Sequence, residues 1–278
     1  MLEKKISVQP IDAVIETTGS RPVVVKDTNL DDFACKYDSP QKLLKEYLAH
    51  HFLQIWGLPV MTAAFIEVLP EHIDPNNIKQ GIITNRTQPH HFRKPCFGTL
   101  YNNDSSLMTN TLVGLKSNYT ELNKYVNKDD FLKIALFDLW IVNTDRNHGN
   151  YNILVQSIGG GYLITPIDHS EIFDGFDIGN KLNQLTPEDS ILTSDLASVF
   201  LYNKKKIEAT IVTLLDNFPT FVKECGKILP KLVEHCPDSW CGNRPKLLQD
   251  LNNFVEDDVW MQETLQNFRE LVHRQFKL

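Results

Sequence analysis

The feature that most constrains the fold is a polar segment, NTDRNHGN, at residues 143–150, which separates two apolar stretches. Residues 129–143, DDFLKIALFDLWIVN, have acids at the start and apolar residues around most of a helical surface, which predicts a buried helix. A strand-like apolar run follows the polar segment, and a second run ends at Asp168. Polar side chains gathered between buried segments form either an ordinary turn or a functional site.

The acids and amides of this region have a spacing that suits phosphoryl transfer. Asp145 and Asn150 form the pattern D-x-x-x-x-N, and Asp168 follows eighteen residues later, across a predicted hairpin whose turn is SIGGG at 157–161. The hairpin is expected to bring Asp168 beside Asn150, where both offer oxygen ligands to Mg²⁺. Asp145 is then expected to accept the proton of an attacking hydroxyl.

The alternative is a polar turn whose side chains bond their own backbone. The pattern D-x-x-x-x-N alone favours that alternative, because Asp and Asn are common turn formers. The buried helix before Asp145 and the apolar strand that ends at Asp168 favour a site instead.

The first hundred residues are predicted to be β-rich. Residues 14–17 and 22–26 form a hairpin, residues 33–37 a third strand, and a helix runs from Pro40 to about Trp56. A kinase needs a loop over the phosphates, a strand lysine and a helical acid that holds the lysine. The sequence offers candidates for all three, namely the turn residues Thr17, Thr18, Gly19 and Ser20, the strand residue Lys36, and the helix residue Glu46.

These N-terminal assignments leave alternatives open. Lys26 could take the place of Lys36, and Glu46 could be a solvated acid near Lys42 and His50. The turn has one glycine, whereas a protein-kinase loop has G-x-G-x-x-G.

Composition excludes several classes of protein. With 28 basic and 35 acidic residues among 278, the net charge is −7, which argues against general nucleic-acid binding. The N-terminus has no apolar signal region, and no apolar stretch is long enough for a membrane span, so a cytoplasmic location is expected. The five cysteines are irregularly spaced and are expected to be free thiols. The segment 254–276 is predicted to form one final helix.

The two polar motifs resemble those of a known family. The segments "NTDRNHGNYNILV" and "YLITPIDHSEIF" are similar to the catalytic and metal-binding segments of HipA-like kinases and, more distantly, of phosphatidylinositol 3- and 4-kinases. The segments "ETTGSRPVVVKD", "FACKY", "LLKEYLAHHFLQIWGLPV" and "CFGTLY" also resemble the short, single-domain HipA-like kinases. The resemblance covers roughly residues 10–175.

This resemblance implies an α+β, bilobed protein-kinase-like fold that binds ATP and Mg²⁺ between a β-rich N-lobe, residues 1–101, and a mainly helical C-lobe, residues 102–278. It implies Asp145 as catalytic acid or base, Asn150 and Asp168 as metal ligands, and Lys36 on the ATP phosphates. The hinge strand would pass near the adenine, with contacts from Phe97, Gly98 and Thr99.

The implied activity is that of a protein serine/threonine kinase with a Ser or Thr acceptor in its protein substrate. Some relatives autophosphorylate in the loop, which makes Thr17, Thr18 and Ser20 candidate sites. Some are toxins of bacterial toxin–antitoxin pairs, so an antitoxin or a small HipA-subdomain protein is an implied partner. A lipid or small-molecule kinase and a nucleotide-binding pseudokinase or antitoxin-like partner are the alternatives.

Two positions depart from the family pattern. The histidine that usually follows D-R is Asn147, with His148 one place later, and His169-Ser170 follow Asp168 in place of F-G. Neither departure removes a predicted metal ligand, but both bear on substrate class. Arg146 has two open roles, since it could neutralise a phosphate or pair with an acid of the C-terminal lobe.

Overall fold

The structure is a computed structural model that describes residues 1–11, 13–17, 21–74, 88–175 and 177–278. The chain divides into two compact units. Unit 1 comprises Met1–Leu48, Met61–Asn103 and Glu234–Gly242, and unit 2 comprises Ala49–Val60, Asp104–Val233 and Asn243–Leu278. Two long helices, α1 and α6, contribute residues to both units.

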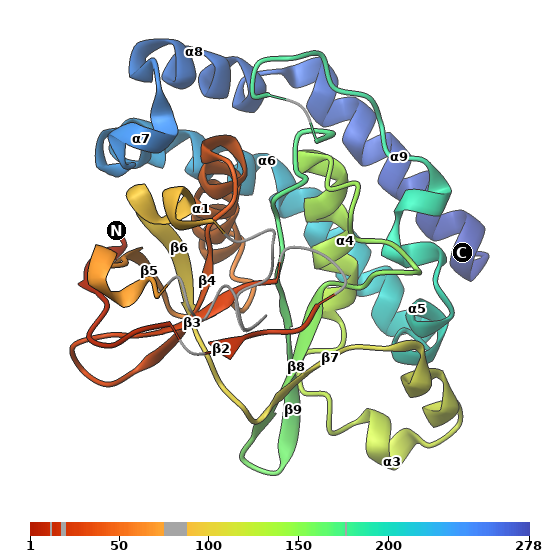
Figure 1. The fold of residues 1–278 in the computed structure, drawn as a ribbon. Coiled ribbons are helices and arrows are strands. Elements are labelled where there is room, and N and C mark those ends of the chain that lie inside the picture. Colours follow the sequence, from red (N-terminus) through yellow and green to blue (C-terminus); the bar gives the residue numbers. More distant parts are fainter. Residues whose placement is uncertain (12, 18–20, 75–87, 176) are drawn as a thin grey trace. The chain divides into compact units, whose positions relative to one another are not determined.

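Unit 1 is built on a six-stranded sheet with the order β1-β5-β6-β4-β3-β2 (Figure 1). Its strands are β1 (Glu3–Ile6), β2 (Ala13–Val14), β3 (Val23–Lys26), β4 (Asp32–Lys36), β5 (Ala63–Glu67) and β6 (Cys96–Leu100). β1 pairs with β5 in parallel and the other neighbours are antiparallel. Val23 and Val25 of β3 are buried while their neighbours are half-buried, which is the alternation of a strand that covers a core on one face.

Helix α1 (Pro40–Ile55) begins and ends as its sequence predicts. The Ser39 hydroxyl accepts a hydrogen bond from the Lys42 amide at 3.4 Å, and Pro40 occupies the first helical position. Gly57, at φ +62°, terminates the helix in the left-handed conformation that glycine adopts without steric cost.

Among its described residues, unit 1 also contains the 3-10 helices η1 (Pro70–His72) and η2 (Pro89–Arg93) and the short helix α7 (Asp238–Cys241). The α7 residue Trp240 fastens this late segment to the sheet. Its indole nitrogen donates to the carbonyl of Pro95 at 3.0 Å, and its ring meets Phe65 edge to face at 5.3 Å.

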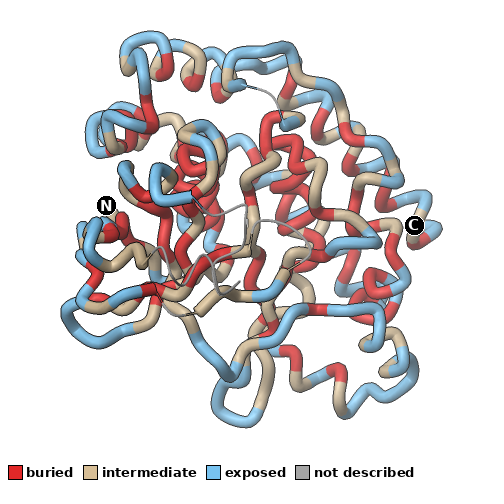
Figure 2. The backbone as a smooth tube through the Cα atoms, in the orientation of Figure 1, coloured by how far each residue is buried: buried red, intermediate tan, exposed pale blue. Residues whose placement is uncertain are grey.

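Unit 2 is mainly helical. Its helices are α3 (Tyr119–Leu122), α4 (Asp130–Ile141), α5 (Asp195–Phe200), α6 (Lys204–His235), α8 (Arg244–Val255) and α9 (Asp258–Phe276), with 3-10 helices η3 (Asn110–Leu115), η4 (Pro187–Asp189) and η5 (Ile191–Thr193). Helix α4 is buried over nearly its whole length (Figure 2). Trp140 of α4 packs on Trp56 at 5.6 Å between ring centroids, and its carbonyl accepts from the Trp260 indole at 2.9 Å.

Unit 2 also contains a three-stranded antiparallel sheet with the order β7-β8-β9, formed by β7 (Ser105–Leu107), β8 (Ile153–Ile158) and β9 (Gly161–Pro166). The side chain of Asn127 lies along the outer edge of β9. Its amide nitrogen donates to the Ile164 carbonyl and its oxygen accepts from the Ile164 amide, each at 2.9 Å. A Cβ at Gly161 would lie 2.7 Å from the Lys124 carbonyl oxygen, so this close approach requires glycine.

The predicted final helix is wrong in one respect. Residues 254–276 do not form one helix, because α8 ends at Val255 and α9 starts at Asp258. The Asp257 carboxylate accepts a hydrogen bond from the Trp260 amide at 2.9 Å and therefore caps a new helix. In the part of the chain that the structure describes, no helix is both long and apolar enough to cross a bilayer.

The expectation of five free thiols is also wrong for two cysteines. Cys236 and Cys241 form a disulfide, whereas Cys35, Cys96 and Cys225 are free and buried. The reason is local, because α6 ends at His235 and the turn at Pro237 brings the two Cα atoms to 6.5 Å, within the range that a disulfide spans.

Candidate active site

The polar segment begins where helix α4 ends, and its start is fixed by hydrogen bonds to the helix. Val142 takes a left-handed conformation, φ 51°, that turns the chain out of the helix. The Asn143 amide donates to the Asp138 carbonyl at 2.9 Å, and its side-chain nitrogen donates to the Asp138 carboxylate at 3.2 Å. The Asn143 side-chain oxygen accepts from the amide of Asp145 at 3.4 Å. Asp145 is therefore tied to the end of a buried helix.

The Asp145 carboxylate is held by two amide side chains. Asn150 donates to one oxygen at 3.1 Å, and Asn152 donates to the other at 2.8 Å. Sequence reasoning grouped Asn150 with this acid by the D-x-x-x-x-N spacing, as a metal ligand beside Asp168, and missed Asn152. An asparagine just before a strand is common, so the only available signal was the repeat Asn150-Tyr151-Asn152 at the exit of the polar segment.

Asn147 has a local role that accounts for its departure from the family pattern. Its side-chain oxygen accepts from the Gly149 amide at 2.9 Å, and its backbone pairs with that of Asn150 in both directions, at 3.0 and 3.2 Å. Asn147 therefore builds the tight turn that returns the chain from Asp145 to Asn150. His148 is exposed at the tip of this turn.

Asp168 lies just after β9, with φ 58°, and is half-buried. One oxygen of its carboxylate accepts from the Ser170 hydroxyl at 3.2 Å. The preceding residue, Ile167, donates its amide to the Asn152 carbonyl at 2.8 Å. Asn152 therefore links the two acids, because its side chain holds Asp145 and its backbone holds the strand end that leads to Asp168.

Arg146 is fully buried, and its ionic partner is Asp138 of α4, at 2.5 Å. Of its two open roles, the structure forms the pair with an acid of the C-terminal part. Burial raises the pKa of Asp138 to about 6, although Arg146 and Asn143 oppose this rise. The remaining guanidinium bonds go to the carbonyls of Tyr151 and Ile167 and to the ring of His169.

Unit 1 contains the expected lysine–acid pair. Lys36 of β4 forms an ion pair with Glu46 of α1, which is only 4% exposed. Lys26 pairs with Asp32 of the neighbouring strand at 2.6 Å, so the structure forms the Lys36 alternative. A carboxylate at such burial needs a partner, and Lys36 supplies it.

The structure describes some of the candidate loop and hinge residues. The Thr17 hydroxyl accepts from the Arg21 amide at 3.1 Å, whereas Thr18, Gly19 and Ser20 lie outside the described residues. The other three candidates, Phe97, Gly98 and Thr99, lie in β6, which pairs with β4 on one side and β5 on the other. A Cβ at Gly98 would collide with Cγ1 of Ile66, so only glycine fits there without moving β5.

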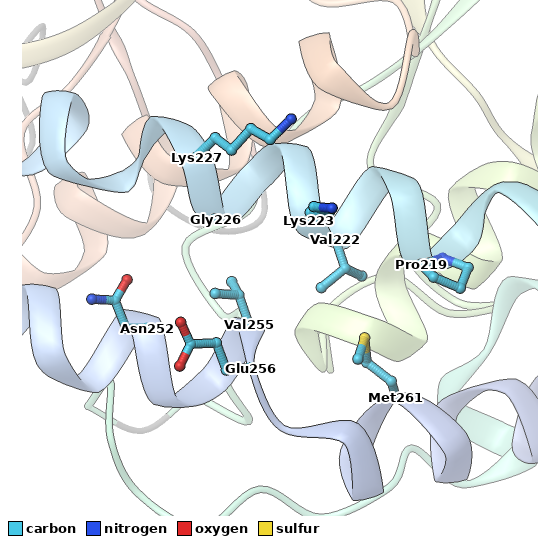
Figure 3. Close-up of a pocket in the computed structure, with 9 residues that line it drawn as sticks. All are labelled: Pro219, Val222, Lys223, Gly226, Lys227, Asn252, Val255, Glu256 and Met261. Carbon is cyan, nitrogen blue, oxygen red and sulfur yellow. The ribbon is translucent and has the colours of Figure 1, made fainter.

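The structure also contains a groove away from these residues. It lies between α6 and the junction of α8 and α9, with a volume of about 360 Å³ (Figure 3). Figure 3 shows Val222 of α6 and Met261 of α9 projecting into the same space. Of the site residues within the described ranges, none lines this groove.

Several solved structures are similar to this chain. The Helicobacter pylori proinflammatory kinase CtkA matches it with a TM-score of 0.53 and 14% identity, over 95% of this chain and 99% of CtkA. The Golgi casein kinase with Mn/ADP bound matches with a TM-score of 0.47 and 13% identity, over 94% and 74% of the two chains. The HipA protein of Shewanella oneidensis MR-1, in a complex with HipB and operator DNA, matches with a TM-score of 0.45 and 12% identity, over 94% and 68%.

The fold therefore defines a protein of the kinase-like class, as the sequence predicted. The sequence pattern of the HipA-like kinases matches residues 20–271, and the chain belongs to this family of phosphotransferases. Among curated protein sequences, none matches the chain.

Proposed function

We propose that this protein is an ATP- and Mg²⁺-dependent serine/threonine kinase that phosphorylates a protein substrate. The observation that carries the proposal is the Asp145 carboxylate, held by Asn150 and Asn152 at the end of a buried helix. Both amides donate to this carboxylate, so they fix its direction. An oriented acid within reach of the acceptor hydroxyl is what phosphoryl transfer requires.

Asp145 has the role of general base in this proposal. The acceptor hydroxyl oxygen attacks the γ-phosphorus of ATP, the bond from that phosphorus to the β–γ bridging oxygen breaks, and ADP leaves. The hydroxyl proton passes to Asp145. Because little covalent chemistry falls to the protein in such a reaction, orientation of the acid and of the phosphates accounts for most of the rate enhancement.

Asn150 and Asp168 fit a hard divalent cation. Asn150 donates its amide nitrogen to Asp145, which leaves its amide oxygen as the atom available to a metal, and Asp168 adds a carboxylate. Mg²⁺ is commonly held by one or two protein oxygens together with substrate phosphates, and there it neutralises phosphate charge. Among the described residues no cluster of three or more His, Cys, Asp or Glu side chains could hold a metal, which fits a site that depends on the nucleotide.

Lys36 is the proposed phosphate-binding cation of unit 1. Its ion pair with buried Glu46 holds the ammonium group near a fixed position on β4. In this proposal the phosphates are contacted by the turn residues Thr17, Thr18, Gly19 and Ser20. The adenine is contacted by the β6 residues Phe97, Gly98 and Thr99. The support for these roles is the membership of the chain in the HipA-like kinase family, whose pattern matches residues 20–271, and the place of Phe97, Gly98 and Thr99 in β6.

The test is phosphate transfer from labelled ATP in the presence of Mg²⁺, with the protein itself, a mixed protein substrate and phosphoinositide vesicles as acceptors. Asp145→Asn should lower transfer by about 10²- to 10⁴-fold, the usual contribution of a general base, while ATP still binds. Asp168→Asn should weaken the Mg²⁺-dependent part of ATP binding. Asp177→Asn makes the same chemical change at an exposed position of unit 2 and is the matched control.

Three results would contradict the proposal in different ways. Transfer by Asp145→Asn and Asp168→Asn at the wild-type rate would refute the site. Transfer to phosphoinositide but not to protein would replace the protein substrate with a lipid. ATP binding by the wild type without transfer to any acceptor would indicate a pseudokinase.

A further inference from the structure

The buried guanidinium of Arg146 joins three segments of unit 2, namely α4, the polar segment and residues 167–169. One terminal nitrogen donates to Asp138 of α4 at 2.5 Å, and Nε donates to the Tyr151 carbonyl at 3.1 Å. The other terminal nitrogen donates to the Ile167 carbonyl at 2.6 Å and lies 3.0 Å from Nε2 of His169. The side chain is 0% exposed, so it cannot reach a solvent-borne phosphate.

These contacts fall on the immediate neighbours of the proposed reacting groups. Tyr151 lies between Asn150 and Asn152 in the chain. Arg146 itself follows Asp145, so its side chain ties the residue next to the acid to the far end of the turn, between the two amide partners.

The Arg146 side chain also bonds the residues on both sides of Asp168. The Ile167 carbonyl comes just before this acid and the His169 ring just after it. A shift of the guanidinium would therefore move the proposed base and the proposed metal ligand together.

We propose that Arg146 is a positioning residue that fixes the distance between Asp145 and Asp168 by bonding the end of the turn that carries Asp145 and the residues on both sides of Asp168. This inference rests on the proposed kinase function. It also assigns a role to the second departure from the family pattern, because His169 accepts a bond from the arginine. Since the guanidinium has only donors, Nε2 of His169 carries a lone pair and its proton lies on Nδ1.

Arginine is required here by geometry. Its planar fork directs several N–H groups to fixed points, whereas a lysine ammonium is one point charge on a flexible chain. Arg146→Lys would keep an ionic partner for Asp138, but one ammonium group cannot reach the Tyr151 carbonyl, the Ile167 carbonyl and the His169 ring at once. The substitution therefore separates the charge of Arg146 from its cross-linking role.

The test uses Arg146→Lys, and His169→Leu as a second variant that leaves the arginine in place. Misplacement of reacting groups by about 1 Å costs on the order of 10²-fold in rate. We expect Arg146→Lys to lower kcat by about that factor, with the KM for ATP changed by less than about threefold, the pattern of a lost transition-state interaction. His169→Leu should lower kcat in the same direction, and His169→Gln, which supplies an amide oxygen as acceptor, should restore part of it.

Hydrogen–deuterium exchange supplies a readout that does not depend on activity. Arg146→Lys should raise exchange in segments 143–152 and 167–170 together, while α9 stays protected. Val272→Ala, a cavity variant at a buried position of α9, is the control for general destabilisation. If Arg146→Lys affects rate and exchange no more than Val272→Ala at equal loss of Tm, or loosens only one of the two segments, the positioning role is refuted.

The exchange result also separates this inference from the proposed function. A wild-type protein that transfers no phosphate would refute the kinase proposal. Even then, faster exchange in both segments of Arg146→Lys would establish that Arg146 links segments 143–152 and 167–170. Faster exchange in only one of them would exclude this link.

Discussion

The adjacent histidines of α1, His50 and His51, should make the protein sensitive to mild acid. Both are 7% exposed, and their rings meet edge to face at 5.2 Å between centroids. Burial lowers the pKa of His50 to about 3 and that of His51 to about 4, and the repulsion between the two rings lowers the pKa of His50 further. The unfolded chain protonates each ring near the ordinary value of 6.5.

The sign and size of the effect follow from proton linkage. Below pH 6.5 the unfolded state binds protons that the folded state refuses, so stability falls as pH falls until the folded pKa values are reached. Each pH unit in this window is worth about 1.36 kcal/mol per histidine. Between pH 6.5 and pH 5 the loss is about 2 kcal/mol for each ring and about 4 kcal/mol for both, a large share of the roughly 5–15 kcal/mol that holds a typical domain folded.

The assay is urea unfolding at pH 7.5, 6 and 5, with the wild type and the double variant His50→Gln/His51→Gln. Carboxylates that titrate in this range affect both proteins alike, so the difference between them isolates the histidines. The wild type should lose about 4 kcal/mol more than the double variant between pH 7.5 and pH 5. Equal pH dependence of the two proteins would show that the rings are protonated in the folded state, and the reasoning from burial would fail.

Two substitutions test one stabilising contact in each unit. Lys36→Met should abolish most phosphate transfer and cost about 3 kcal/mol of stability, because buried Glu46 loses the opposite charge of Lys36. Lys36→Met/Glu46→Leu should recover stability in urea but not transfer, and recovery of both would refute the role of Lys36. Gly161→Ala should cost about 1–3 kcal/mol in urea unfolding, since its Cβ would lie 2.7 Å from a backbone oxygen. Gly114→Ala, with no atom within 4 Å, is its control, and equal effects of the two alanines would contradict the steric argument.

Sequence reasoning predicted the contact that depends on a short separation along the chain. Lys36 meets Glu46 because a helix follows the strand at once. The kinase-like fold and the family are likewise confirmed. The catalytic and metal-binding roles of the site residues stay predictions.

The features that sequence reasoning missed depend on contacts between elements. The bond of Asn152 to Asp145 requires the β8–β9 hairpin to be in place, and the choice of partner by Arg146 required knowing that Asp138 is buried inside α4. The helix break at Asp257 was missed for a different reason. An acid within an amphipathic run has the same sequence pattern whether it is a solvated side chain or a helix cap.

The amide side chain of Asn127 has a consequence for how the edge of β9 is closed. A sheet edge presents unpaired N–H and C=O groups unless another part of the chain bonds them, and unpaired edges are a common route to aggregation. Along β9, the backbone of residues 124–126 bonds Tyr162, and the Asn127 side chain bonds both backbone groups of Ile164. Because Ile164 is 0% exposed, replacing Asn127 with a residue that lacks the amide would leave two buried backbone groups without these hydrogen bonds, at the strand that leads to Asp168.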